Sequence, residues 1–205
     1  MAGETATQEE RSQAARRTLI AAAIDILAEE GYRRLTFTRI QEVAGLSRGL
    51  VAYHFGTKVA LVEGVIAVIR EQYHDQAQHD PSRTGYDEVR GMVRTYLDRF
   101  RADPRPAKVM LVLGTDSIGE PGPVTDAVRE TYQSFRDDLA RFLERGLADG
   151  SIRAGIDPGA HAIVIEAFLR GIVLQYLVDP TRVDLDAVTA AAYQTVDALA
   201  GPAGG

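Results

Sequence analysis

The sequence predicts an all-α protein, with a small three-helix unit near the N-terminal end and a larger helical part after it. Apolar residues recur at three- and four-residue spacing through most of the chain, which is the period of one helical face. Ser, Thr or Asp stands before many of these stretches, and Gly or Asp-Pro follows them, as helix caps and stops do. Hydrophobic residues make up 45% of the 205 residues, which is enough to form a core.

Four segments are expected along the chain: a disordered arm over 1–14, the three-helix unit over 15–57, the larger helical part over 58–200, and a disordered tail over 201–205. The arm is expected to be disordered because it is polar. The first helix is expected from about Arg16 to Gly31, where the glycine stops it. Its apolar face consists of Leu19, Ala23, Ile24 and Leu27.

Residues 36–58, TFTRIQEVAGLSRGLVAYHFGTK, predict a helix, a tight turn, a second short helix and the start of a third. Thr36 can cap the first of these helices, Gly45 can end it in a left-handed conformation, and Ser47 can cap the second. Two short helices joined by a turn with Gly form the helix-turn-helix that enters the DNA major groove. The side chains expected to face inward are Phe37, Ile40, Val43, Ala44, Val51 and Phe55.

The outward side chains of the second helix favour a DNA-binding domain over a plain helical hairpin. Arg48 stands in the first turn, the end that meets base edges, and Tyr53 and His54 offer donors to phosphate oxygens. The helix that begins at Lys58 adds its positive N-terminal end. The candidate DNA-binding residues are Thr36, Thr38, Ser47, Arg48, Gly49, Leu50, Ala52, Tyr53, His54, Thr57 and Lys58.

The charge distribution is compatible with this interpretation. The net charge is −6, yet residues 1–60 hold 8 Lys and Arg against 7 Asp and Glu, so the acidic excess lies in the later part of the chain. A local basic face matters more for DNA binding than the global balance. Arg11, Arg16 and Arg17, near the start of the first helix, either reach DNA phosphate or the minor groove or are solvated charges.

The same stretch resembles the signature of the tetracycline-repressor (TetR) family of bacterial transcription regulators. The resemblance is firm over about the first 75 residues and implies a dimer that binds a palindromic operator. In Ala52 this chain departs from the pattern, because many members carry there a Tyr that touches DNA, and the burden shifts to Tyr53. The matching residues are Thr36, Phe37, Ile40, Ala44, Gly45, Leu46, Ser47, Arg48, Gly49, Tyr53, His54, Phe55 and Lys58.

A connecting helix is expected from Lys58 to about Ala77, followed by a loop over 79–85 with the sequence HDPSRTG. In the family, the equivalent helix joins the DNA-binding unit to the rest, and its tilt can change the spacing of two recognition helices. His74 and His79 are five residues apart and lie poorly on one helical face, so a metal site there is not expected.

The later part of the chain predicts five more helices. They are expected over 86–102, 108–116, 124–148, 159–178 and 185–199. Pro104 and Pro106 bracket a break, and Pro123 is expected at a first helical position. Gly150 stops the third of these helices. Asp157 and Asp184 cap the fourth and fifth.

The helix expected over 159–178 is apolar on nearly all sides, as a helix in a large core or in an interface is. The helix expected over 185–199 is rich in Ala, which lets helices approach closely. We infer a homodimer through a four-helix bundle made of these two helices from each subunit; the alternative is an ordinary buried core helix in a monomer. A dimer is also what reading a palindrome calls for.

A small-molecule effector pocket is expected among the helices between 86 and 178, as the family resemblance implies. Glu166 and Arg170 stand four residues apart on an otherwise apolar helix, so they either pair with each other or across the dimer, or anchor a polar ligand. Plain core packing is the alternative for each apolar candidate. The candidate effector-binding residues are Tyr96, Phe100, Met110, Leu113, Tyr132, Phe135, Glu166, Phe168, Arg170 and Tyr176.

No enzyme, cofactor or metal site is expected. The chain has no Cys, no Gly-rich phosphate loop and no nucleophile–base set, and no run of about 18 apolar residues that would span a membrane. The expected function is a cytoplasmic, ligand-responsive transcriptional repressor released from its operator by a small molecule. The alternatives are a helical binding or interaction module with weakened DNA binding, or a regulator that requires its ligand to bind DNA.

Overall fold

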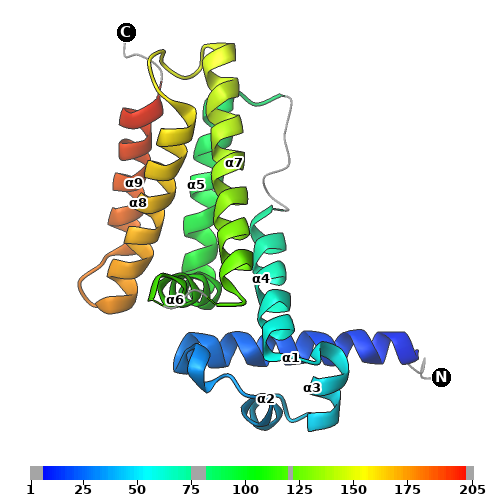
Figure 1. Cartoon of the computed structure of the whole chain (residues 1–205). Helices are drawn as coiled ribbons and strands as arrows, with labels where there is room; N and C mark the ends of the chain where they lie inside the picture. Colours follow the sequence, from blue (N-terminus) through cyan, green and yellow to red (C-terminus); the bar gives the residue numbers. More distant parts are fainter. Residues whose placement is uncertain (1–6, 75–81, 120–121, 202–205) are drawn as a thin grey trace, which may run out of the picture.

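The computed structural model describes residues 7–74, 82–119 and 122–201, which are helical with no strand among them. The α1 helix (Gln8–Glu30) lies across one end of the molecule, with the η1 turn (Tyr32–Arg34), α2 (Phe37–Ala44) and α3 (Arg48–Phe55) on its outer side (Figure 1). The α4 helix (Lys58–His74) follows α3 and rises toward the rest of the chain. The prediction of an all-α protein is confirmed.

The C-terminal part is a bundle of long helices with one short helix across its end. The α7 helix (Thr125–Asp149) packs against both α5 (Gly85–Ala102) and α8 (Pro158–Val178), and α9 (Leu185–Ala200) packs against α5 and α8. The α6 helix (Arg105–Gly119) lies across the lower end of this bundle in Figure 1 and packs on α1. Within the described residues, the bundle therefore contacts α1 chiefly through α6.

The apolar core forms two clusters. One joins the inner faces of α1 to α4 with Val109, Met110 and Leu113 of α6 and with the start of α7. The other fills the space between α5, α7, α8 and α9. The N-terminal unit thus shares a continuous core with α4 and α6, rather than hanging on a flexible linker.

The first helix begins earlier than expected. The described part of the expected arm, residues 7–14, is helical from Gln8 onward, whereas residues 1–6 lie outside the described residues. The reason is a capping box, in which the Thr7 hydroxyl accepts from the Glu10 N–H and the Glu10 carboxylate accepts from the Thr7 N–H. A polar sequence with a good cap can form a helix without an apolar face when a longer helix continues it.

Three further expectations are corrected. The break at Pro104 and Pro106 is shorter than expected, because Pro106 lies in the first turn of α6, where its missing N–H removes no helical hydrogen bond. Pro123 does not open a helix; it lies in a turn closed by Gly122 and Thr125, and α7 begins at Thr125. Val43 is 41% exposed rather than inward, because α2 is short and covers α1 mainly through Ile40.

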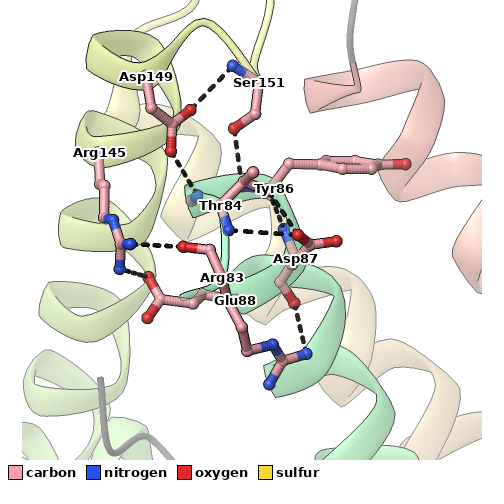
Figure 2. Close-up of polar contacts among 9 residues, drawn as sticks. Arg83, Thr84, Tyr86, Asp87, Glu88, Arg145, Asp149 and Ser151 are labelled. Carbon is pink, nitrogen blue, oxygen red and sulfur yellow. Dashed lines mark hydrogen bonds and ion pairs between the residues drawn. The ribbon is translucent and has the colours of Figure 1, made fainter. Parts of the chain in front are cut away.

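A polar cluster fastens the start of α5 to the end of α7 (Figure 2). The Asp149 carboxylate accepts from the Gly85 N–H at 2.9 Å, and the Ser151 hydroxyl accepts from the Tyr86 N–H at 3.2 Å. The buried Glu88 carboxylate accepts from Arg145 at 2.9 Å. The two helices cross so closely here that a Cβ on Gly85 would stand 2.1 Å from the backbone nitrogen of Gly146.

The α8 helix is long and apolar enough to cross a membrane by length and composition, contrary to the expectation that no segment would be. Within the described residues it packs on α7, α6, α5 and α9 and carries the Glu166–Arg170 pair. Its exposed large apolar residues are Ile163, Val164, Leu174 and Val178.

Candidate DNA-binding face and effector pocket

The helix-turn-helix forms as the sequence predicts. The Thr36 hydroxyl accepts from the Arg39 N–H at 3.1 Å and caps α2, and Gly45 ends that helix at φ 66° and ψ 18°. The Ser47 hydroxyl caps α3 by accepting from the Leu50 N–H at 3.4 Å. A left-handed residue is favoured as Gly, so the turn between the helices is set by the AGLS sequence itself.

The α3 helix is held by its inner residues and presents the others outward. Val51 and Phe55 are buried, whereas Tyr53 is 78% exposed. Thr36, Thr38, Ser47, Arg48, Gly49, Ala52 and Thr57 are also exposed, and Leu50, His54 and Lys58 are half-buried. The predicted DNA-binding residues therefore lie on adjoining parts of one helix-turn-helix, with Arg48 at the exposed N-terminal turn of α3.

Lys58, a predicted phosphate donor, also makes a contact within the protein that the sequence did not indicate. Its ammonium donates to the Tyr32 carbonyl oxygen at 2.6 Å and lies 3.8 Å from the centroid of the Tyr32 ring. Burial lowers the pKa of Lys58 below its usual value. This hydrogen bond uses one of the three N–H donors of the ammonium, and the other two remain for a phosphate oxygen. Helical spacing could not predict this contact, because Tyr32 lies 26 residues earlier in the chain, in the η1 turn.

The N-terminal turns of α1 run alongside α3 and form a groove with it. Leu50, Tyr53 and His54 line one side, and Arg11 and residues near it line the other. His54 Nε2 is buried and makes no hydrogen bond within the described part of the chain. Arg16 lies over the Phe55 ring, with its guanidinium carbon 5.5 Å from the ring centroid. Arg11 is thus placed beside the candidate DNA-binding face.

An ion pair that the sequence analysis missed fastens α2 to α1. Arg39 donates to Glu30 at 2.7 Å and to Glu42 at 3.1 Å. The hydrogen bond from Arg39 lowers the pKa of the Glu30 carboxyl. Arg39 therefore fixes the position of α2 against α1, and its guanidinium group is paired within the protein.

A mostly apolar pocket lies where α4, α5, α6, α7 and α8 meet. The cavity is small, with a volume of about 40 Å³, so it has room for only a few water molecules. Its wall is made by Ile69, Arg70, Met92, Tyr96, Ala107, Met110, Thr131, Phe135, Asp138 and Arg170. Two of these residues, Ile69 and Arg70, belong to α4.

Part of the predicted effector set lines this pocket. Tyr96, Met110, Phe135 and Arg170 are in its wall, and Tyr96 and Phe135 meet edge to face with ring centroids 5.8 Å apart. Tyr132 borders a neighbouring groove together with Arg170. The remaining candidates belong to the core clusters or their edges: Leu113 and Phe100 are buried, Tyr176 packs on Phe100, Phe168 is half-buried, and Glu166 is buried behind the wall.

Glu166 and Arg170 pair within α8, and a third residue joins them. Arg170 donates to the Glu166 carboxylate at 2.7 Å, and Arg136 of α7 donates to it at 3.0 Å. The Arg170 guanidinium carbon lies 3.6 Å from the centroid of the Tyr132 ring, whose hydroxyl donates to the Met110 carbonyl at 2.8 Å. Burial raises the pKa of Tyr132. The chain of contacts links α8 through α7 to α6.

The pocket residues outside the predicted effector set are two residues that precede the expected span, two polar residues, and the apolar Met92 and Ala107, which helical spacing does not separate from core residues. Ile69 and Arg70 precede residue 86, and Thr131 and Asp138 are polar residues on α7. Asp138 is 7% exposed and pairs with Arg141 at 2.6 Å. Within the described ranges, no group of three or more His, Cys, Asp or Glu is placed to hold a metal ion.

Comparison with known proteins agrees with this geometry. Residues 85–201 match the family described as BetI-type transcriptional repressor, C-terminal, and residues 19–65 match bacterial regulatory proteins, tetR family. Among curated relatives, the chain is 26% identical over 188 residues to the HTH-type transcriptional regulator TtgR of Pseudomonas putida, covering 86% of each. It is 25% identical over 190 residues to the regulator BetI 1 of Chromohalobacter salexigens, covering 89% of this chain and 88% of that one.

Solved structures share the fold. A transcriptional regulator from Saccharomonospora viridis in complex with choline aligns with a TM-score of 0.79 at 18% identity, covering 93% of this chain and 100% of that one. The SmeT–triclosan complex aligns with a TM-score of 0.76 at 25% identity, covering 94% of each chain.

Proposed function

This chain belongs to the TetR family of bacterial transcriptional regulators, with a BetI-type C-terminal domain, and on that premise we propose that it is a repressor that holds a palindromic operator as a dimer and releases it when a small molecule enters the α4–α8 pocket. The observation that carries this proposal is the double role of α4. It follows directly from α3, which presents Arg48 and Tyr53, and it supplies Ile69 and Arg70 to the pocket wall.

DNA binding is assigned to the exposed face of α3. Arg48 is proposed to read a base edge in the major groove. Tyr53, which is 78% exposed, is proposed to contact the phosphate backbone in place of the Tyr that many family members carry at the position of Ala52. Thr36 and Thr38 stand at the start of α2, where N–H groups and hydroxyls suit phosphate oxygens. Arg11, beside α3, is a further candidate for a backbone contact.

Dimerisation is assigned to α8 and α9. At 3.6 residues per turn, the exposed apolar residues Ile163, Val164, Leu174 and Val178 all fall within about 100° around the axis of α8, so they form one stripe. Ala187, Ala190 and Ala191 of α9 are exposed as well, and small residues allow a close helix approach. An apolar stripe of this kind marks an interface, and a two-fold dimer would set the two α3 helices about 34–36 Å apart.

Release is proposed to follow from the size of the pocket. With room for only a few waters, the pocket must expand to admit a ligand, and its wall includes α4 and α6. The α6 helix is tied to α1 by the Lys108–Glu29 and Arg105–Asp25 ion pairs, at 3.2 and 2.7 Å. The expanded state is proposed to bind DNA less tightly than the compact state. A ligand that prefers the expanded state then lowers the affinity for DNA, and DNA lowers the affinity for the ligand by the same factor, as linkage requires.

Two alternatives make different predictions. The first alternative is a helical binding module that has lost DNA binding, for which the Ala at position 52 would be one cause. Such a protein would bind duplex DNA weakly and without sequence preference. A regulator that needs its ligand first would select DNA only in the presence of that ligand. We propose no catalytic role, and we place the protein in the cytoplasm, where its operator would be.

The test is selection of bound duplexes from a random DNA pool at near-physiological salt, since affinity without a stated salt concentration has no meaning. Enrichment of a palindrome with half-sites one helical turn apart is the expected result. A folded, dimeric protein that enriches no sequence, with and without candidate ligands, would refute the proposal.

A further inference from the structure

The charges around the α4–α8 pocket are unbalanced. The wall holds Arg70 and Arg170 against a single carboxylate, that of Asp138. Asp138 is already bonded to Arg141 at 2.6 Å. The wall itself therefore carries an excess of positive charge beside apolar surface.

The residues behind the wall increase this excess. The Glu166 carboxylate, with 6% of its side chain exposed, is shared between Arg136 and Arg170, so one negative charge faces two guanidinium groups. Counting the wall and these ion-pair partners, four guanidinium groups surround two carboxylates. A positive excess in a partly desolvated site favours an anion, because the attraction is less screened there than in water.

Arg70 is the charged residue best placed to meet such an anion. It is exposed at the mouth and also lines the neighbouring groove between α4 and α7, where the carboxylates of Glu63, Asp126 and Glu130 lie outside the pocket wall. It has no hydrogen bond or ion pair with any residue in the described ranges, whereas Arg170 is committed to Glu166 and Tyr132. A guanidinium group suits carboxylate by bidentate hydrogen bonding.

The rest of the wall fits an apolar body. Tyr96 and Phe135 offer aromatic surface, and Met92 and Met110 are unbranched side chains that can change rotamer and open room in a pocket this small. The two carboxylates in and behind the pocket wall speak against a cationic ligand inside the pocket. Asp138 and Glu166 both have guanidinium partners that a bound cation would have to displace.

We propose that the effector is a small organic acid with an apolar body, whose anionic head meets Arg70 at the mouth while its body lies against Tyr96, Phe135 and Met110. This rests on the pocket being the effector site, as proposed above. The acid then acts directly on the connecting helix, since Arg70 belongs to α4.

The test compares three probes that share one apolar body: phenylbutyrate, phenylbutanol and phenylbutylamine, with choline as a fourth. Binding to the full-length dimer is measured by isothermal titration calorimetry. The acid is expected to bind about tenfold or more tightly than the alcohol and the amine, as a charge-assisted hydrogen bond warrants. Equal binding of the three, preference for the amine or choline, or no binding of the acid would overturn the proposal.

Charge variants connect the preference to named residues. Arg70→Gln, on the exposed mouth, and Arg170→Gln, which leaves Glu166 paired with Arg136, are each expected to reduce the preference for acid over alcohol by about tenfold. Arg94→Gln removes an exposed positive charge of α5 outside the pocket wall and serves as the matched control, with the preference unchanged. An equal effect of all three variants would indicate a general effect of net charge and refute the site.

The proposed regulatory function is tested separately by the DNA selection described above. A protein that enriches an operator but binds phenylbutylamine or choline better than phenylbutyrate remains a regulator with a different ligand class. A protein that binds the acid in an Arg70-dependent way but selects no DNA keeps the ligand site and loses the proposed function. The two proposals therefore fail in distinguishable ways.

Discussion

The ammonium of Lys58 donates to the Tyr32 carbonyl oxygen at 2.6 Å and lies 3.8 Å from the centroid of the Tyr32 ring. One side chain at the start of α4 thereby holds the η1 turn, which leads from α1 into the helix-turn-helix. The family signature places a basic residue here, and in this chain its first role is to brace the unit that presents α3.

Lys58→Ala is expected to lower the free energy of unfolding by about 1–2 kcal/mol, because a charge-assisted hydrogen bond and a cation–π contact are lost. Urea unfolding measures it. Lys108→Ala is the control, since Lys108 pairs with the exposed Glu29 and such pairs contribute about 0–1 kcal/mol. We also expect the salt dependence of DNA binding to be the same in Lys58→Ala as in the parent. A salt slope lower by about one unit would show that Lys58 also contacts a phosphate.

Arg48→Ala is expected to remove discrimination at one or two base pairs of each half-site, at a cost of about 1–3 kcal/mol for a bidentate contact to guanine. Repeating the DNA selection with the variant measures the change directly. Arg94→Ala, an exposed arginine of α5, should leave both the preferred sequence and the affinity unchanged. An Arg48→Ala variant that enriches the parent sequence with the same preference at every position would show that Arg48 reads no base.

Leu174→Glu is expected to convert the dimer to monomers, because two-fold symmetry would place two carboxylates in an apolar interface. Because burying two unpaired carboxylates is costly, the dimer affinity is expected to fall by about a hundredfold or more. Sedimentation velocity over a range of protein concentrations measures it. The control is Val43→Glu, because Val43 is 41% exposed on α2 in the N-terminal unit, whereas Leu174 is 45% exposed on α8. If both variants remain dimeric, the interface lies elsewhere.

Gly85→Ala is expected to destabilise the C-terminal bundle by about 2–4 kcal/mol, as overpacking against backbone does. Its Cβ would stand 2.1 Å from the Gly146 nitrogen, and neither backbone can yield without separating α5 from α7. Gly119→Ala is the control, since nothing lies within 4 Å of its Cβ position and its φ is not in the left-handed region. Thermal unfolding compares them, and an equally stable Gly85→Ala protein would contradict the close crossing.

The elements that local signals define were predictable from the sequence. The caps at Thr36, Ser47, Asp157 and Asp184 and the left-handed Gly45 act within a few residues, so the sequence alone shows them. The inward positions of Val51 and Phe55 followed from helical spacing in the same way. The α1 and α6 helices begin earlier than expected, and these differences have local causes too. A capping box starts α1 within a polar segment, and Pro106 is accommodated in the first turn of α6.

The site residues that escaped prediction depend on contacts between distant segments. Arg70 enters the pocket because α4 leans on α7, and Lys58 meets Tyr32 across 26 residues of chain. Phe100 and Leu113 were as aromatic or apolar as the true wall residues, and only the packing of α5 and α6 turned them into the core. Helical spacing gives the face that a residue occupies on its own helix but not the element that covers it.

Tyr86 is expected to titrate far above its usual range, and Asp197 is expected to account for part of the shift. Burial, and then the hydrogen bond that its hydroxyl donates to Asp197 at 2.5 Å, raise the pKa of Tyr86 to about 12. The folded state thus favours the neutral phenol. This contribution to stability is fully present below the ordinary pKa of 10.0 and is lost as the pH rises from there through about 12.

The difference in phenolate absorbance between the parent and Tyr86→Phe isolates this one tyrosine during an alkaline titration. Asp197→Asn should bring the pKa of Tyr86 down while leaving it above 10.0, because burial between α5 and α9 remains. Asp186→Asn is the matched control on the same helix, since the 85% exposed Asp186 pairs with Arg101 and does not face Tyr86. An unchanged Tyr86 titration in Asp197→Asn would mean that the carboxylate does not hold α9 to α5 through this hydroxyl.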